Sequence, residues 1–139
     1  MLADQNRFDD ALQMLDKSIQ VCYRLKGQGP CIKGILAQSL DTKAGLLQLQ
    51  GKFEDATEIL YKVVGIQKES LGEMHPATAE AYETLANAYV LQEMLQDGIA
   101  ASAEALKIRR RTIGDDHPDT KRRMEAHRSL LNRLLENRG

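Results

Sequence analysis

The sequence has no tryptophan, and aromatic residues make up only 4% of its 139 positions. Proline occurs three times, and no stretch alternates Val, Ile or Thr with polar residues, as a half-buried strand would. Ala, Leu, Gln, Glu, Lys and Arg dominate instead, and these residues have high helix propensity. We therefore expect an all-α protein of at most one ordinary domain, long enough to bury a sizeable core.

Cysteine is also scarce: only Cys22 and Cys31 are present, and they flank the Gly- and Pro-containing segment 27–30. They offer no zinc-type spacing and no disulfide framework, which favours a reducing compartment, although one bridge across the segment is geometrically conceivable. No run approaches 18 apolar residues, and no basic-then-apolar leader opens the chain. These absences predict a cytoplasmic protein without a membrane span.

Three similar segments recur along the chain: "NRFDDALQML" (6–15), "GKFEDATEIL" (51–60) and "EMLQDGIAAS" (93–102). Each reads as a polar turn followed by acidic residues and a stripe of apolar residues at the i, i+3, i+4, i+7 spacing of one helical face. The third is poorer in bulk and contains Gly98, so a neighbouring helix should approach closely there. Another amphipathic segment precedes each of the last two copies: residues 37–50 come before 51–60, and residues 78–92 come before 93–102. This arrangement predicts a helix hairpin that recurs about every 42 residues.

The core positions of these hairpins carry a recognisable pattern. They read Tyr82-x-x-Leu85-Ala86-x-x-Tyr89 followed by Gly98, and Leu40-x-x-x-Ala44-x-x-Leu47 followed by Ala56, Leu60 and Val63. This resembles the tetratricopeptide repeat (TPR) pattern, and the long period with G-x-x-H-P-x-T between units is similar to the kinesin-light-chain variety. The resemblance implies a right-handed α-solenoid of antiparallel helix hairpins, with about three repeats and a carboxy-terminal capping helix.

The resemblance also implies a domain plan for residues 1–139: a half repeat at 2–29, repeats at 30–72 and 73–114, and a capping helix at 117–137. Because the first hairpin lacks most of its first helix, we expect either a piece of a longer array or an apolar face covered by another chain. Four more residues separate Pro30 from Leu40 than Pro76 from Tyr82, which predicts either a longer first helix or an extra turn at the start of this repeat.

Two charged residues depart from the repeat pattern. Lys43 occupies a position that is usually apolar, so either its side chain should extend to the surface or the second repeat should pack loosely there. Arg128 stands where Ala44 and Ala86 stand in the earlier copies. A large charged side chain at that position predicts a terminal helix whose apolar face is more exposed to solvent, that is, a wetter face.

Two histidines lie in nearly identical strings, "LGEMHPAT" (71–78) and "IGDDHPDT" (113–120). They could be half of a metal or catalytic site, but Gly ends a helix and Pro begins one, and a histidine ring nitrogen can cap the free backbone N–H groups there. Equivalent loops of stacked hairpins lie about 10 Å or more apart, whereas zinc ligands lie about 2 Å from the metal. We interpret both histidines as structural.

No nucleophile, phosphate-loop or metal motif appears, so we expect no enzymatic activity, no cofactor and no metal.

The resemblance implies binding of a protein or peptide partner in a concave groove lined by the first helix of each hairpin. Aligned inward positions hold Asp41, Glu83 and Glu125, so the groove should prefer basic or neutral segments near its middle and acidic groups near Arg122 and Arg133. TPR adaptors that grip a terminal carboxylate have lysine at those acidic positions, so a carboxylate clamp is disfavoured. The full predicted groove comprises Gln38, Asp41, Gly45, Gln48, Glu80, Glu83, Asn87, Val90, Arg122, Glu125, Ser129, Asn132 and Arg133.

Two alternatives remain open at this level. The truncated first repeat could serve self-assembly or subunit docking, which would make a homo-oligomer, through the stripe Phe8, Ala11, Leu12, Leu15 and Ile19. The basic segment 107–133, with "KIRRR" at 107–111 and "KRR" at 121–123, could bind RNA or another anionic polymer. Residues 107–139 hold 10 Lys/Arg against 5 Asp/Glu, whereas residues 1–106 hold 9 against 15. Charge runs are more often solvated faces, so nucleic acid is the weaker expectation.

Overall fold

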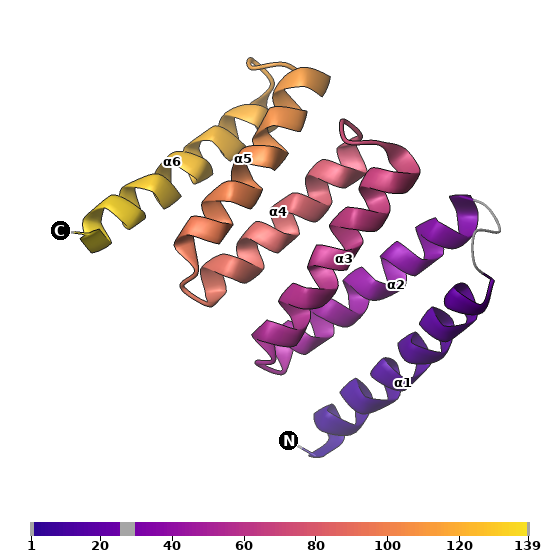
Figure 1. Cartoon of the computed structure of the whole chain (residues 1–139). Coiled ribbons are helices and arrows are strands. Elements are labelled where there is room, and N and C mark those ends of the chain that lie inside the picture. Colours follow the sequence, from indigo (N-terminus) through magenta and orange to yellow (C-terminus); the bar gives the residue numbers. More distant parts are fainter. Residues whose placement is uncertain (1, 26–29, 139) are drawn as a thin grey trace. The chain divides into compact units, whose positions relative to one another are not determined.

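The computed structural model describes residues 2–25 and 30–138. Its helices are α1 (Leu2–Arg24), α2 (Pro30–Leu49), α3 (Phe53–Leu71), α4 (Pro76–Leu91), α5 (Leu95–Thr112) and α6 (Pro118–Arg138) (Figure 1). Every element in the described residues is a helix, so the predicted all-α class is confirmed. The expected linker at 27–30 lies almost wholly outside the described residues. No helix in the described ranges is long and apolar enough to cross a bilayer.

The chain forms two compact units that meet within α3. The first, residues 1–66, contains α1, α2 and most of α3, and the second, residues 67–139, contains the end of α3 with α4, α5 and α6.

In the first unit, α1 packs along α2. Lys43 of α2 reaches Asp16 of α1, with Nζ 2.6 Å from Oδ1, and the lysine side chain remains 26% exposed. The expectation that Lys43 extends to the surface is therefore confirmed. The hydroxyls of Ser18 and Ser39 lie 3.3 Å apart. The buried hydrophobic residues of this unit are Ile19, Cys22, Leu36, Ala37, Leu40, Ala44 and Leu47, with Ala56, Leu60, Val63 and Val64 of α3.

The extra residues after Pro30 lengthen α2. That helix has 20 residues, whereas α4, its counterpart in the next repeat, has 16. The predicted longer helix is confirmed, because four inserted residues add about one turn without disturbing the periodicity of the core positions.

In the second unit, α5 packs against both α4 and α6 (Figure 1). The closest approach involves Gly98 of α5, which is buried. A Cβ built on Gly98 would lie 3.1 Å from Val90 Cγ2 and 3.4 Å from the carbonyl oxygen of Ala86. The expected close approach at this glycine is confirmed, because a Cβ there would require the Val90 side chain to shift by a few tenths of an ångström.

The two His-Pro strings form the helix starts that we predicted. Nδ1 of His75 accepts a hydrogen bond of 3.0 Å from the backbone N–H of Ala77, and Nδ1 of His117 accepts one of 3.1 Å from Asp119. The glycines that end the preceding helices, Gly72 and Gly114, have φ of +100° and +88°, which favours glycine. Both histidines therefore cap helices.

Helix α6 has a wetter apolar face than the other helices. Met124, Leu130 and Leu134 are only half-buried, while Leu131 and Leu135 remain 39% and 64% exposed. Arg128 is exposed as well. The expectation of a wetter face is confirmed.

Candidate functional site

The predicted groove residues of the first unit lie on α2. Gln38 and Asp41 are exposed, and Gly45 and Gln48 are half-buried. Because these positions are three or four residues apart, they share one face of α2. The side chains are accessible as expected, and their role in binding stays a prediction.

In the second unit, the predicted positions divide between α4 and α6. On α4, Glu80 and Asn87 are exposed, while Val90 is half-buried beside Gly98. The α6 residues Arg122, Glu125, Ser129, Asn132 and Arg133 are all exposed. The two arginines each hold a carboxylate: Arg122 pairs with Asp119, and Arg133 Nη2 lies 3.4 Å from Glu93 Oε2.

Glu83 does not behave as predicted, because it is buried, with 8% of the residue exposed. Arg109 of α5 donates to both carboxylate oxygens, with Nη2 3.2 Å from Oε1 and Nε 3.3 Å from Oε2. Arg123 of α6 adds a contact of 2.9 Å between its Nε and Oε2. The expectation of an open acidic side chain at Glu83 is therefore wrong: this carboxylate joins three helices inside the unit.

Within the unit, five of the nine Lys and Arg residues of the basic segment 107–133 form ion pairs. Arg109 and Arg123 pair with Glu83, and Arg110 pairs with Asp115, where Nε lies 2.7 Å from Oδ1. The Arg110 guanidinium, through this hydrogen bond, lowers the pKa of Asp115. The same bond raises the pKa of Arg110. Among the described residues, Lys107 and Arg111 have no ion-pair partner.

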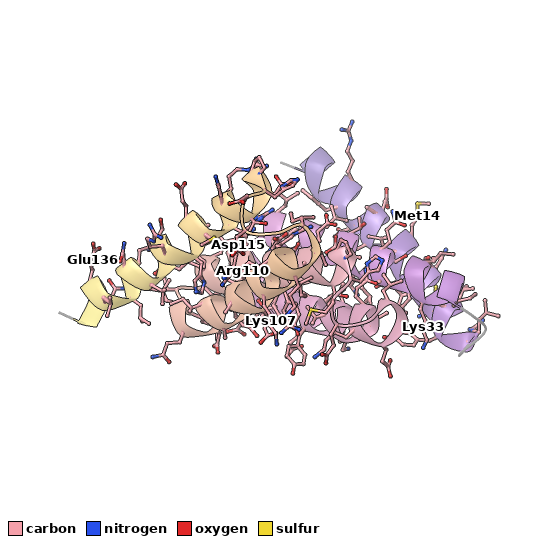
Figure 2. The ribbon with its side chains drawn as sticks, turned by 90° about the horizontal axis from the view of Figure 1, so that it is seen from above. Met14, Lys33, Lys107, Arg110, Asp115 and Glu136 are labelled. Carbon is pink, nitrogen blue, oxygen red and sulfur yellow. The ribbon has the colours of Figure 1, made fainter. Side chains whose placement is uncertain are left out.

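A pocket of about 490 Å³ opens between α5 and α6. Figure 2 shows Lys107 and Arg110 on α5, with Asp115 beside Arg110. His127 contributes from α6, and its Nδ1 lies 3.2 Å from Ser102 Oγ. The full lining is Ala103, Leu106, Lys107, Arg110, Arg111, Asp115 and His127. The sequence marked the basic run but not the pocket, since His127 joins it only when α6 packs on α5.

The proposed self-association stripe of α1 is covered within the first unit. Phe8, Ala11, Leu12 and Leu15 are half-buried, and Ile19 is buried. These residues follow the side of α1 that packs on α2, and their part in self-association stays a prediction. The exposed apolar residues of α1 lie elsewhere: Met14, at 73% exposure, projects away from the ribbon (Figure 2).

Comparison with known proteins agrees with this architecture. The sequence matches the tetratricopeptide repeat family over residues 36–97 and again over residues 78–119, which together span more than half of the chain. Among curated proteins, none matches the sequence significantly.

Two solved structures show the same fold. BtubC (BKLC) from P. vanneervenii superposes with a TM-score of 0.70 at 19% identity, over 91% of this chain and 50% of that one. A protein described as a kinesin light chain with nearly identical TPR-like repeats, from Podosopora anserina, superposes with a TM-score of 0.67 at 20% identity. That match covers 96% of this chain and 68% of the other. The present chain thus spans half the length of BtubC.

The hairpin pattern, the Gly-to-Pro helix boundaries and these matches lead to one assignment. The chain belongs to the tetratricopeptide repeat family, and its fold is similar to that of solved kinesin-light-chain-like TPR structures.

Proposed function

We propose that the chain is a non-enzymatic adaptor whose first-helix surfaces bind an extended or helical peptide. Tetratricopeptide repeats indicate a protein-interaction scaffold. The observation that carries the proposal is the row of exposed polar side chains on α4 and α6, at Glu80, Asn87, Glu125 and Ser129. These positions are spaced to recur on one side of each helix, where a partner segment can contact them together.

The charge preference of this surface is the one that sequence predicted, but fewer acidic residues supply it. The carboxylate of Glu83 forms ion pairs with Arg109 and Arg123, so it cannot contribute a free negative charge to this surface. The remaining acidic residues of the predicted groove on these two helices are Glu80 and Glu125, which favour a basic or neutral segment beside them. Arg133 is 45% exposed, and an acidic group of the partner could compete there for its guanidinium.

A charge-reversal experiment tests the proposal. The double variant Glu80→Lys/Glu125→Lys is compared with wild type in pull-downs read by mass spectrometry, and the captured proteins are then tested as synthetic peptides by fluorescence polarisation. The matched control is Glu54→Lys/Glu58→Lys, which makes the same charge change at exposed positions of α3. Basic peptides should lose affinity for the first variant and keep it for the control.

The choice of positions matters, because reversal at Glu83 would bring a third cation beside Arg109 and Arg123 and would destabilise the fold. Equal retention of every basic peptide by the double variant and by the control would contradict the groove assignment.

The alternatives receive less support. Self-assembly through Phe8–Ile19 would need a face that α2 already covers. Binding of RNA would need a row of free cations, but most arginines of segment 107–133 hold carboxylates. A cytoplasmic location is part of the proposal, and the buried free thiol of Cys22 fits a reducing compartment.

A further inference from the structure

We propose that the pocket between α5 and α6 is a second binding site, which takes an acidic peptide segment of a protein partner. None of the residues that line this pocket belongs to the predicted groove. Binding at this pocket therefore depends on other side chains than binding in the groove does, and the two sites can be tested separately.

The cationic wall of the pocket comes from one face of α5. Lys107 and Arg111 are four residues apart, so they lie one turn apart, with a rise of about 6 Å. Both are exposed, and neither forms an ion pair with any described residue. Two cations at this spacing match two carboxylates that are themselves one turn apart on a bound helix.

The rim and the opposite wall are held in place by contacts within the unit. Asp115 accepts from Arg110 through both oxygens, at 2.7 and 3.3 Å, which fixes that guanidinium at the edge of the pocket. On the α6 side, Nδ1 of His127 is engaged with Ser102, which leaves Nε2 of the ring for a ligand. The pocket thus has prearranged polar walls rather than only mobile lysine and arginine side chains.

Two of the residues that line the pocket, Ala103 and Leu106, are apolar. An apolar side chain of the ligand could bury against Leu106 while flanking carboxylates contact Lys107 and Arg111. The volume of about 490 Å³ suits a few side chains, in the range of ordinary ligand pockets.

The surroundings favour an acidic peptide over RNA. A nucleic acid strand gains affinity by neutralising successive phosphates along a basic track. Here the two unpaired cations of the pocket are followed by Asp115, Asp116 and Asp119, which would repel a continuing phosphate backbone. A short acidic segment needs only the two cations, and the charge of Asp115, which itself lines the pocket, is paired with Arg110.

The test uses the full chain and three fluorescein-labelled probes. They are a twelve-residue helical peptide of Ala, Leu and Glu, with glutamates one turn apart; the same peptide with every Glu replaced by Gln; and a twelve-nucleotide oligo-uridine. Binding is measured by fluorescence polarisation at low and at physiological salt. Wild type should bind the acidic peptide more tightly than the other two probes.

Two double variants locate the site. Lys107→Ala/Arg111→Ala should weaken binding of the acidic peptide by about tenfold or more, which corresponds to losing one or two charge-assisted contacts. The control Lys121→Ala/Arg128→Ala removes the same charge from exposed positions of α6 outside the pocket, and it should change affinity by less than about twofold. Backbone amide shifts in two-dimensional NMR spectra should change at Lys107, Arg111 and His127.

Each of four results would overturn the proposal: no binding of the acidic peptide by wild type, equal binding of its Gln analogue, equal loss in both double variants, or tighter binding of oligo-uridine that depends on Lys107 and Arg111. The last would assign the pocket to nucleic acid instead. Because all four substituted residues are exposed and alanine favours helices, misfolding is not expected to obscure the comparison.

Discussion

Thr78 and Thr120 occupy the same place in the two His-Pro strings, and both are fully buried. Their hydroxyls have different surroundings. Thr78 Oγ1 donates to the carbonyl oxygen of Gly72 at 2.8 Å. Within the described residues, Thr120 Oγ1 has no hydrogen-bond partner. A buried hydroxyl without a partner costs free energy, whereas a paired one contributes modestly.

Substitution by valine, which has nearly the same shape, should therefore affect the two sites differently. Thr78→Val should lower the free energy of unfolding by about 1 kcal/mol, because a buried hydrogen bond is lost and the Gly72 carbonyl is left unpaired. Thr120→Val should be neutral or stabilising. Urea unfolding followed by circular dichroism measures both, and equal destabilisation by the two substitutions would show that Thr120 has a partner after all.

The Arg110–Asp115 pair makes a prediction about pH. Arg110 lowers the pKa of Asp115 in the folded chain, so the pair contributes stability above the unfolded pKa of the carboxyl group, and that contribution is lost as pH falls through the folded pKa. The effect on stability is small because both side chains are more than half exposed. Arg110→Ala should raise the pKa of Asp115 toward its ordinary range, as measured by NMR titration of the carboxyl carbon. An unchanged titration would mean that the pair does not form in solution.

At the scale of the elements, the Glu83 cluster links α4, α5 and α6. Arg109 is 18% exposed and Arg123 is 48% exposed at the side chain, so the two arginines should not contribute equally. A buried carboxylate that meets one partner in bidentate geometry is sensitive to loss of that partner. The contact with Arg123 is closer to a surface ion pair, which contributes little.

Removal of each residue of the cluster should therefore follow an order. Glu83→Ala should lower the free energy of unfolding by about 2–4 kcal/mol, because two arginines lose their shared counter-ion in a partly buried place. Arg109→Ala should cost less, and Arg123→Ala should cost under about 1 kcal/mol. Thermal unfolding at matched pH and salt gives the order, and a large effect of Arg123→Ala with a small one of Arg109→Ala would reverse our assignment of the principal partner.

At the scale of the whole molecule, the covered face of α1 bears on whether copies of the chain associate through it. Leu15 is half-buried on the side of α1 that packs on α2, while its neighbour Met14 is 73% exposed. The two adjacent residues are thus matched probes of a covered and an open side of one helix.

Leu15→Asp should lower the free energy of unfolding by about 2 kcal/mol or more, because it places a charge in an apolar contact. Met14→Asp should stay within about 0.5 kcal/mol of wild type. Light scattering should give the same mass for wild type and for Leu15→Asp. If Leu15→Asp instead lowered the mass without lowering stability, the stripe from Phe8 to Ile19 would be an intermolecular contact.

The sequence by itself determined the repeat, its helix boundaries and several local details. Gly72 and Pro76 mark one boundary, and the extra residues after Pro30 predicted the longer α2. The extension of the Lys43 side chain to the surface and the close approach of α4 to α5 at Gly98 were also predictable. These features depend on the spacing of apolar residues, on backbone conformation and on side-chain size. All three act within a few residues, so the amino-acid sequence alone can predict them.

Only the tertiary structure decided which charges remain available. Glu83 looks like an exposed groove residue in the repeat pattern, but its partners Arg109 and Arg123 come from positions 26 and 40 residues away. The pocket likewise combines residues of α5 with His127 of α6, which are brought together by helix packing. Periodicity states which face of a helix a residue occupies, but pairing of charges depends on which neighbouring helix presents an opposite charge within reach, and that is a property of the packed chain.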